Sequence, residues 1–548
     1  MAALAVGLEV ALPLSGFDDR MYHASRVAYW LQHRSVLPFE THNDRQTVFS
    51  FGSELVFLLP MLFTKTEAWG RLFFASGLPL AAVGLVRVIE AAGGSRRVAW
   101  AAALVFVSTP LVFKQGSSGL APEPWLVVFV LGAAFWLLRA RGPGGERAWP
   151  LGWAGGFVAL AINVKFTAVF LLPGALVAVW WCGNGRPVRA GVRFGGGLAL
   201  GTIVSGLLVP VTVNWREHGH PFGPAGMRAA HQSRIDARQL AVHAARLPFL
   251  LFDPPALPTA ELREKLQSWA EAGAARLGAS ALLPGESPSG WPGPFCFRFG
   301  PTAGRFSLAG MLWLPLLALA LWRTRAEQRS RGGPVSAAAV LLVLQVPMLL
   351  GLLFLVRWPG DVNAMARFFV SPFALGVALG AVLWAEWPLR RTAGFLAGAA
   401  ILLPVALILR YGLYMFVLHV AHLRETAKID EPFAEALRAM PAPAHVLLVA
   451  QQDARDYGLF RPADQLCNQV FPWGKAPFTP ERLRGLIVRD GITHVLVQND
   501  NRVDLHWSPP VETAPMVAWL RAQPDLAEIP LPAEHQRLFV VRAAGAAR

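Results

Sequence analysis

Residues 16–54 form a polar segment between two apolar stretches and carry many potentially reactive side chains. Two adjacent carboxylates, Asp18 and Asp19, lie near its start, and aromatic, histidine and arginine side chains follow. Apolar helices need little of this chemistry to associate, because close packing and a few interhelical hydrogen bonds hold them together. The segment therefore suggests a reaction at a membrane surface.

Helical spacing separates the two carboxylates. If residues 18–33 are helical, Asp18 shares one face with residues that follow at intervals of four, namely Tyr22, Arg26 and Trp30. Asp19 is rotated by about 100° and pairs with His23 instead. We expect Asp18 to face the site and Asp19 to bind or tune a neighbour. The alternative is an interfacial helix whose aromatic and charged residues only anchor it among headgroups.

Further ionisable residues stand beside apolar runs. Arg45 could bind a phosphate through its forked guanidinium donors, or a lipid headgroup. Glu54 either caps the helix that follows or faces the site. Glu123 lies between two prolines where an apolar run begins, so it either binds substrate or a metal, or is a helix-start acid favoured by the helix dipole.

Lys165 is enclosed between two apolar runs. A lysine at the bilayer centre costs about 2.5–3.5 kcal/mol, so this one either lies near the surface or has a partner. Ionisable residues in such places are functional candidates by default, and a snorkelling side chain is the alternative. Arg367 is a similar candidate, and its alternative role is an ion pair with Asp361.

The composition is that of a membrane protein. Of the 548 residues, 54% are hydrophobic and 16% are charged, and the mean hydropathy is +0.41. Soluble domains carry about 25% charged residues. Several apolar runs reach the roughly 20 residues that cross a bilayer. A mainly helical transmembrane bundle follows, because backbone polar groups inside lipid must be satisfied internally.

The positions of the basic residues behind the net charge of +15 predict the topology. Clustered arginines fill short connectors, as they do in cytoplasmic loops, and no basic face of a soluble domain indicates nucleic-acid binding. Residues 15–67 and 215–305 then become outer loops, and residues 53–63 an interfacial or re-entrant helix. Residues 1–14 are short for a span and lack a clear signal sequence, so that span is tilted or the native start lies upstream. The eleven expected spans lie near 1–14, 68–90, 98–113, 124–138, 151–164, 166–181, 194–214, 306–322, 334–356, 366–387 and 392–416.

The character of the chain changes at about residue 425. Short apolar, β-branched runs of strand type occur at 445–450, 493–498 and 537–541, with helical patterns at 480–489 and 511–522. We expect a transmembrane domain over 1–424 and a small α/β domain over 425–548, on the outer side. This second domain has no glycine-rich nucleotide fingerprint.

The first outer loop resembles that of a known family. It reads Asp-x-x-x-Tyr-His-x-x-Arg-Val-x-x-Trp-Leu-Gln-x-x-Ser-Val, followed by Thr-x-x-x-Arg-Gln. This pattern is similar to the first outer loop of bacterial GT-C glycosyltransferases, the superfamily of the protein O-mannosyltransferases and lipid A aminoarabinose transferases. Phe166 and His220 depart from the family's motifs. Weaker matches lie at Ser117–Glu123, Ala161–Thr167, Trp215–Pro224 and Arg367–Pro372.

The resemblance implies transfer of a sugar, with inversion, from a polyprenyl-phosphate donor to a glycan, lipid or protein acceptor. The reaction would take place on the outer face of the cytoplasmic (inner) membrane. Asp18 would be the general base, with Asp19 beside it in the catalytic group. Fixed positive charge would stabilise the departing lipid phosphate, from Lys165, Arg367 and Arg45. The remaining candidates would bind substrate, and these are Tyr22, His23, Arg26, Glu54 and Glu123.

Other functions predict other patterns. A transporter or flippase of lipid-linked saccharides would place its charges near the membrane midplane, often with internal repeats, whereas these polar residues concentrate in outer loops. A scaffold that recruits partners would tolerate changes at Asp18. Residues 217–220 offer metal ligands in a turn, which predicts exposed histidines more strongly than a zinc site. No cofactor is assigned, and the need for a divalent cation stays open. Three cysteines allow one bridge, Cys296–Cys467, but favour unrelated thiols.

Overall fold

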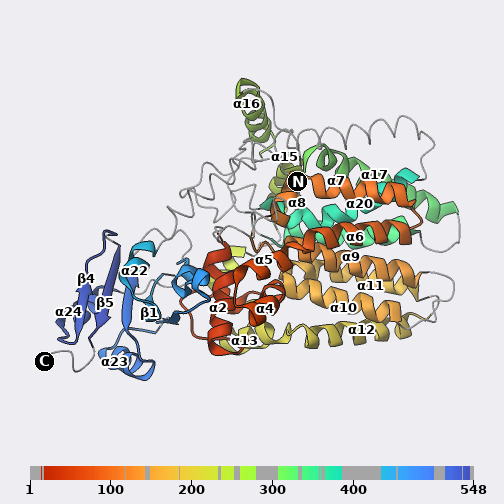
Figure 1. The fold of residues 1–548 in the computed structure, drawn as a ribbon. Helices are drawn as coiled ribbons and strands as arrows, with labels where there is room; N and C mark the ends of the chain where they lie inside the picture. Colours follow the sequence, from red (N-terminus) through yellow and green to blue (C-terminus); the bar gives the residue numbers. More distant parts are fainter. Residues whose placement is uncertain are drawn as a thin grey trace.

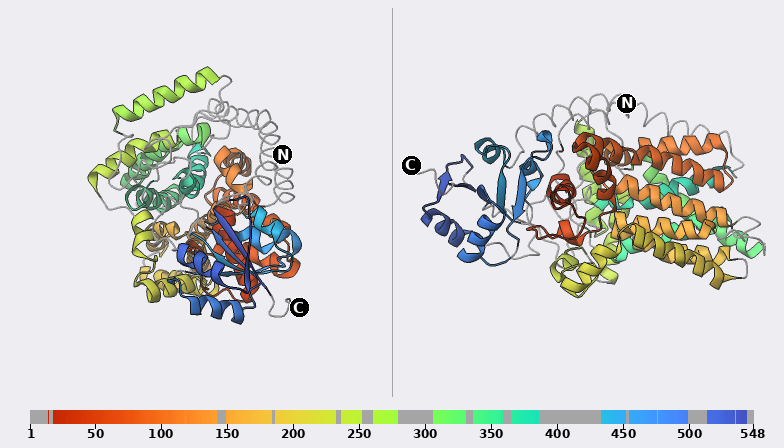
Figure 2. Two further views of the ribbon diagram at one scale, coloured as in Figure 1. Left: turned by 90° about the vertical axis from the view of Figure 1, so that its left-hand side faces the viewer. Right: turned by 60° about the horizontal axis from the view of Figure 1, so that its bottom comes forward.

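The computed structural model is mainly helical, with one small sheet near the C-terminus (Figure 1). A bundle of side-by-side helices forms one end of the molecule, and the α/β domain forms the other. Helices α2, α4 and α5 lie between them, in Figure 1 and in the right-hand view of Figure 2. The structure describes residues 14, 18–117, 119–141, 149–183, 186–231, 236–251, 260–278, 306–330, 336–356, 358, 365–385, 433–451, 454–474, 476–498, 513–533 and 535–542.

Long apolar helices build the bundle. Within it, α9 packs against α6 and α10, α10 against α12, α11 against α18, and α20 against α7, α17 and α18. Their solvent-facing surfaces carry large apolar side chains such as Trp180, Val204 and Trp322, as a lipid-facing surface would. The helices are α6 (Gly77–Ala91), α7 (Arg96–Ser108), α9 (Glu123–Ala140), α10 (Trp149–Val164), α11 (Leu171–Cys182), α12 (Pro187–Val204), α17 (Ser307–Ser330), α18 (Ala337–Phe354) and α20 (Val370–Ala385).

The expected number of eleven spans is not confirmed. Among the described residues, four helical stretches are long and apolar enough to cross a membrane, or six if two bent pairs each count as one. The longest joins α5 (Glu67–Ala75) to α6, over the expected span 68–90. Helices α10 and α11 are apolar but too short to be counted among these stretches. The last expected span, 392–416, and nearly all of the first lie outside the described residues.

Two expected spans are bent rather than straight. The first bend, of 75°, separates α7 from α8 (Pro110–Ser117). Thr109 before the proline is extended, because proline disfavours a helical residue before it. The second bend, of 76°, separates α12 from α13 (Leu208–His218) at Gly206, whose φ of +74° favours glycine.

Glycines allow α10 and α12 to pack closely. A Cβ added to Gly197 would lie 1.8 Å from the carbonyl oxygen of Gly152, and one added to Gly155 would lie 2.1 Å from that of Phe194. Gly152 and Gly156 on α10, and likewise Gly197 and Gly201 on α12, are four residues apart and bring the two backbones into contact, a common arrangement in membrane bundles. This contact lies in the first half of α10 and joins it closely to α12.

The segment over 15–67 that the sequence predicts to be the first outer loop is folded and mostly buried where the structure describes it. Its helical start, predicted over residues 18–33, is confirmed as a π-helical turn η1 (Asp19–His23) that continues into α2 (Ala24–His33). The chain leaves this helix at Arg34 with a φ of 51°. The expected short helix at 53–63 is confirmed as α4. The remaining helices that precede the C-terminal domain are α3 (Arg45–Val48), α4 (Gly52–Thr64), η2 (Phe166–Phe170), α14 (Ala225–His231), α15 (Ala237–Leu251), α16 (Ala260–Arg276) and η3 (Arg367–Phe369).

The C-terminal domain is a five-stranded sheet in the order β2-β1-β3-β5-β4. Strand β1 pairs in parallel with β2 and β3, while β5 runs antiparallel to β3 and β4. Side chains alternate along β1, so that Leu447 and Val449 join the core beneath α23 and α24 while Val446 and Leu448 face the other core. The elements are α22 (Ala434–Ala439), β1 (His445–Val449), η4 (Asp456–Phe460), η5 (Pro462–Asp464), β2 (Gln469–Pro472), α23 (Pro480–Arg489), β3 (His494–Gln498), α24 (Ala514–Ala522), β4 (Leu526–Ile529) and β5 (Gln536–Val541).

Candidate active site

Four charged residues from distant parts of the chain meet in one row. Arg367 Nη1 donates to Asp18 Oδ2 at 2.9 Å, and Arg367 Nε lies 3.9 Å from Glu123 Oε1. Lys165 Nζ donates to the same Glu123 oxygen at 2.7 Å. The signs alternate along the row Asp18–Arg367–Glu123–Lys165, which we call the charge chain. The structure thus brings together four of the residues that the sequence singled out.

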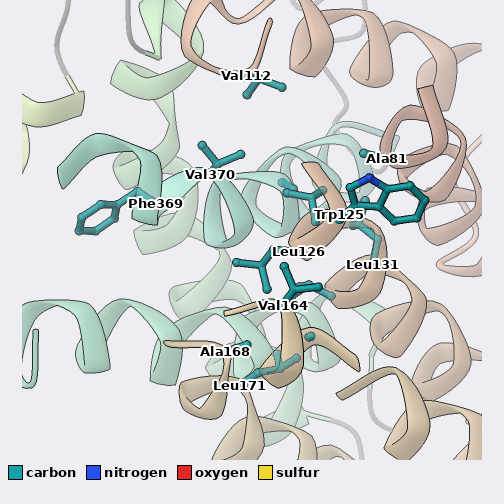
Figure 3. Close-up of a cluster of buried hydrophobic side chains, with 14 of the residues drawn as sticks. Ala81, Val112, Trp125, Leu126, Leu131, Val164, Ala168, Leu171, Phe369 and Val370 are labelled. Atoms are coloured by element: carbon teal, nitrogen blue, oxygen red, sulfur yellow. The ribbon is translucent and has the colours of Figure 1, made fainter. Parts of the chain in front are cut away.

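Each member of the charge chain lies at a helix end. Asp18 precedes η1, Glu123 begins α9, and Arg367 begins η3. Lys165 occupies an extended break between α10 and η2. Their neighbours in the sequence are anchored in the apolar core: Figure 3 shows Val164, Ala168, Phe369 and Val370 among buried side chains. This core fixes the backbones from which Lys165 and Arg367 project.

The charge chain runs from a buried end to an accessible one. The Glu123 side chain is 1% exposed and that of Lys165 is 16% exposed, whereas those of Asp18 and Arg367 are 34% and 33% exposed. Lys165 Nζ also lies 3.9 Å from the centre of the Phe368 ring, a cation–π contact. A ligand can therefore reach Asp18 and Arg367 from outside, with Glu123 and Lys165 behind them.

The environment of Asp18 keeps its carboxyl ionised. Burial raises its pKa, but the positive charge and hydrogen bond of Arg367 outweigh burial and hold the pKa below its ordinary value. The same contact occupies one carboxylate oxygen. Asp18 is thus an ionised acceptor whose basicity is reduced while Arg367 remains its partner.

Asp19 points into the protein instead. Its Oδ1 accepts a hydrogen bond from the backbone N–H of Leu120 at 3.1 Å, and the residue is 7% exposed. Gly119 has a φ of +55°, and a Cβ there would lie 1.7 Å from Asp19 Oδ2, so the carboxylate fills the space left by the glycine. Burial raises the pKa of Asp19 to about 6. Asp19 therefore joins the first outer loop to the turn that leads to Glu123.

Arg26, Glu54 and His23 form a buried network beside the charge chain. Arg26 Nη1 donates to Glu54 Oε1 at 2.8 Å, and His23 Nδ1 lies 3.0 Å from the same oxygen. Arg26 also donates to the backbone carbonyls of Arg45, Gln46 and Ser50. These bonds tie α2 to α3 and α4, so the three residues hold the loop in shape.

Tyr22 and Arg45 line the same region. The Tyr22 ring packs on His23, with centroids 4.1 Å apart, and edge-on against Phe49 at 5.7 Å. Arg45 Nη1 lies 2.9 Å from the sulfur of Met21, and its positive charge contributes to lowering the pKa of Asp18. Both side chains are therefore neighbours of Asp18 without direct membership of the charge chain.

The predicted turn after α13 carries histidines but no assembled metal site. The described residues hold no group of three or more His, Cys, Asp or Glu side chains placed to bind a metal ion. His220 Nδ1 accepts from the N–H of Phe222 at 3.2 Å, and the chain turns at Gly219 with a φ of +66°. Cys182 and Cys467 are free thiols, and Cys296 lies outside the described residues.

Sequence reasoning missed Asp456, a fully buried carboxylate of the C-terminal domain. It accepts hydrogen bonds from Ser25 and Tyr29, both on α2. No motif surrounds Asp456 in the sequence, and more than 400 residues separate it from these partners. Only the tertiary structure connects it to the first outer loop.

No protein-family model and no curated protein matches the chain. Similar solved structures include ArnT from Cupriavidus metallidurans in the apo state, with a TM-score of 0.43 and 12% identity over 98% of this chain and 96% of ArnT. For the same protein bound to undecaprenyl phosphate, the TM-score is 0.41 and the identity is 13%, over 100% of this chain and 97% of ArnT. For the Archaeoglobus fulgidus oligosaccharyltransferase, the TM-score is 0.42 and the identity is 11%, over 91% of this chain and 68% of that one. These proteins belong to the GT-C class, which the first outer loop resembles.

Proposed function

We propose that this chain is a membrane glycosyltransferase of the GT-C class. It moves a sugar from a polyprenyl-phosphate donor to an acceptor on the outer face of the cytoplasmic membrane, with inversion at the anomeric carbon. The observation that carries this proposal is the charge chain at the helix ends. One accessible carboxylate stands beside two cations there, which matches the needs of a base and of a phosphate leaving group.

Asp18 is the general base in this proposal. Its free carboxylate oxygen takes the proton of the acceptor hydroxyl as the acceptor oxygen forms a bond to the anomeric carbon. The bond from that carbon to the donor phosphate oxygen breaks, and its electron pair leaves with the lipid phosphate. Arg367 and Lys165 hold the negative charge that develops there, with Arg45 nearby, and preorganised charge of this kind is often the largest catalytic contribution.

The ion pair between Asp18 and Arg367 couples the two halves of this reaction. A donor phosphate that binds Arg367 competes with Asp18 for the guanidinium, which has five donors but one main carboxylate partner here. The negative phosphate then offsets the positive charge of Arg367 that lowers the pKa of Asp18. The pKa of Asp18 rises as a result, and Asp18 becomes a stronger base. Proton acceptance is therefore favoured once the donor is in place.

The surrounding residues hold this arrangement. Arg26, Glu54 and His23 fix the loop that presents Asp18, and Asp19 fixes the turn before Glu123. Tyr22 is 8% exposed and packs against His23 and Phe49, so its ring lies behind the site rather than open to a sugar. In this proposal Arg26, Glu54, His23, Asp19 and Tyr22 all support the residues that react.

A panel of polyprenyl-phosphate sugars tests the proposal. The purified protein should transfer at least one sugar to an acceptor, and Arg367→Gln and Lys165→Met should weaken polyprenyl-phosphate binding at least 10-fold. The matched control is Arg87→Gln, which removes an exposed arginine from α6. Chelation with EDTA in the same assay decides whether a divalent cation takes part.

A flippase would behave differently in these experiments. It would move lipid-linked saccharide across vesicle membranes and yield no new glycosidic bond. Unchanged binding in both variants, together with an absence of any transferred product, would contradict the transferase proposal.

A further inference from the structure

One face of α2 is buried against the C-terminal domain. Ser25, Tyr29 and Gln32 share this face at intervals of four and three residues, and each contacts the α/β domain. In Figure 1 and in the right-hand view of Figure 2, α2 lies between the bundle and that domain. The helix that follows Asp18 is therefore packed on one face against the C-terminal domain.

Asp456 is the polar centre of this contact. Ser25 Oγ donates to its Oδ1 at 2.5 Å, and Tyr29 OH donates to its Oδ2 at 2.9 Å. Gln46 Nε2 approaches Oδ1 at 3.4 Å, and His42 Nε2 lies 3.9 Å from Oδ2. Asp456 is fully buried, so both of its oxygens depend on the first outer loop for partners.

Neighbouring contacts fix the orientation of α2. The Gln32 side-chain amide donates to the Val470 carbonyl at 3.0 Å and accepts from the Val470 N–H at 2.9 Å, as a paired strand would. The Tyr29 ring meets Phe460 edge-on, with centroids 4.9 Å apart. Contacts at both the start and the end of α2 leave it little freedom to rotate or slide.

We propose that Asp456 is a positioning residue for sugar transfer. By holding Ser25 and Tyr29, it sets the helix that presents Asp18, so the C-terminal domain completes the active site without touching the substrate. This inference rests on the proposed function. Ser25 is seven residues from Asp18, about 10 Å along a helix, and a reacting group displaced by about 1 Å can cost about 100-fold in rate.

The test replaces Asp456 with Asn, which keeps the shape and removes the charge. The expected result is a kcat lowered about 10- to 100-fold, a KM for the lipid-linked donor within about 2-fold of wild type, and faster amide hydrogen exchange over residues 18–33 but not in β1. Asp464→Asn is the control, because Asp464 is an exposed acid of the same domain. It should change neither kcat nor exchange.

A second variant covers the case in which Asp456→Asn fails to fold. Tyr29→Phe removes one hydroxyl from the contact and leaves the carboxylate with its other partners, so a kcat loss of about 3- to 10-fold is expected. A wild-type kcat in both variants, or unchanged exchange over residues 18–33, would overturn the inference.

The outcome for Asp18→Asn, measured in parallel, separates this failure from that of the proposed function. If Asp18→Asn is inactive while the Asp456 variant is fully active, only the positioning role fails. If no donor is turned over by wild type, the proposed function fails, and hydrogen exchange alone decides whether Asp456 orders the helix.

Discussion

Glu123→Gln perturbs the charge chain at its most buried point. The substitution keeps the side-chain shape but leaves Lys165 and Arg367 without the negative charge between them. Two unit charges about 4 Å apart interact by about 4 kcal/mol at an effective dielectric constant of about 20, and breaking a buried pair costs about 3–5 kcal/mol. Lys165 is 16% exposed, so water recovers part of the loss. We expect the free energy of unfolding to fall by about 3 kcal/mol.

Thermal unfolding of the purified protein, followed by tryptophan fluorescence, measures this loss. Glu90→Gln is the matched control, because Glu90 pairs at 3.0 Å with Arg87, whose side chain is 66% exposed, and exposed pairs contribute about 0–1 kcal/mol. Added polyprenyl phosphate should restore more stability to Glu123→Gln than to wild type, because a bound anion replaces the missing charge and stabilises by mass action. Unfolding of Glu123→Gln at the wild-type temperature would refute the reasoning.

Two further substitutions have defined outcomes. Gly197→Leu should destabilise the protein by about 3 kcal/mol or more in thermal unfolding, because a Cβ there would lie 1.8 Å from Gly152 oxygen; Gly191→Leu, where nothing lies within 4 Å of an added Cβ, should stay close to wild type. Folding raises the pKa of Asp19 from 3.8 to about 6, so this carboxyl ionises at a lower pH in the unfolded chain than in the folded protein. The folded protein therefore loses stability as pH rises from about 4 to 6. Asp19→Asn should flatten that part of the stability–pH curve, and an equally steep curve would contradict the assignment.

Individual members of the charge chain could be predicted from the sequence, but their pairing could not. Lys165 and Arg367 stand out because ionisable residues are costly beside apolar spans. Nothing in their spacing indicates that Arg367 meets Asp18 while Lys165 meets Glu123, because that depends on how the helices pack. The expected alternative partner of Arg367, Asp361, lies outside the described residues.

Helical spacing predicted the different directions of Asp18 and Asp19 but not the role of Arg26. A strict interval of four places Arg26 on the face of Asp18. The π-helical turn over Asp19–His23 holds more residues per turn, which rotates later residues relative to Asp18. Arg26 therefore turns to Glu54 and to loop carbonyls, a brace that no local pattern reveals.

The elements of the C-terminal domain could also be predicted only in part from the sequence. Strands β1, β3 and β5 and helices α23 and α24 follow from apolar patterning and are confirmed. Strands β2 and β4 were missed, because each has only four residues and they contain Pro472 and Glu528 respectively, which are unfavourable in strands. Their place in the sheet depends on the neighbouring strands.

The role of Asp18 as the base is the central claim, and Asp18→Asn tests it most directly. The measurement is the transfer rate of wild type and variant with the same polyprenyl-phosphate sugar, alongside the affinity of each for polyprenyl phosphate. We predict a rate lowered about 10²- to 10⁴-fold with phosphate affinity retained or increased, because Arg367 loses a competing carboxylate. Transfer by Asp18→Asn at the wild-type rate would contradict the account.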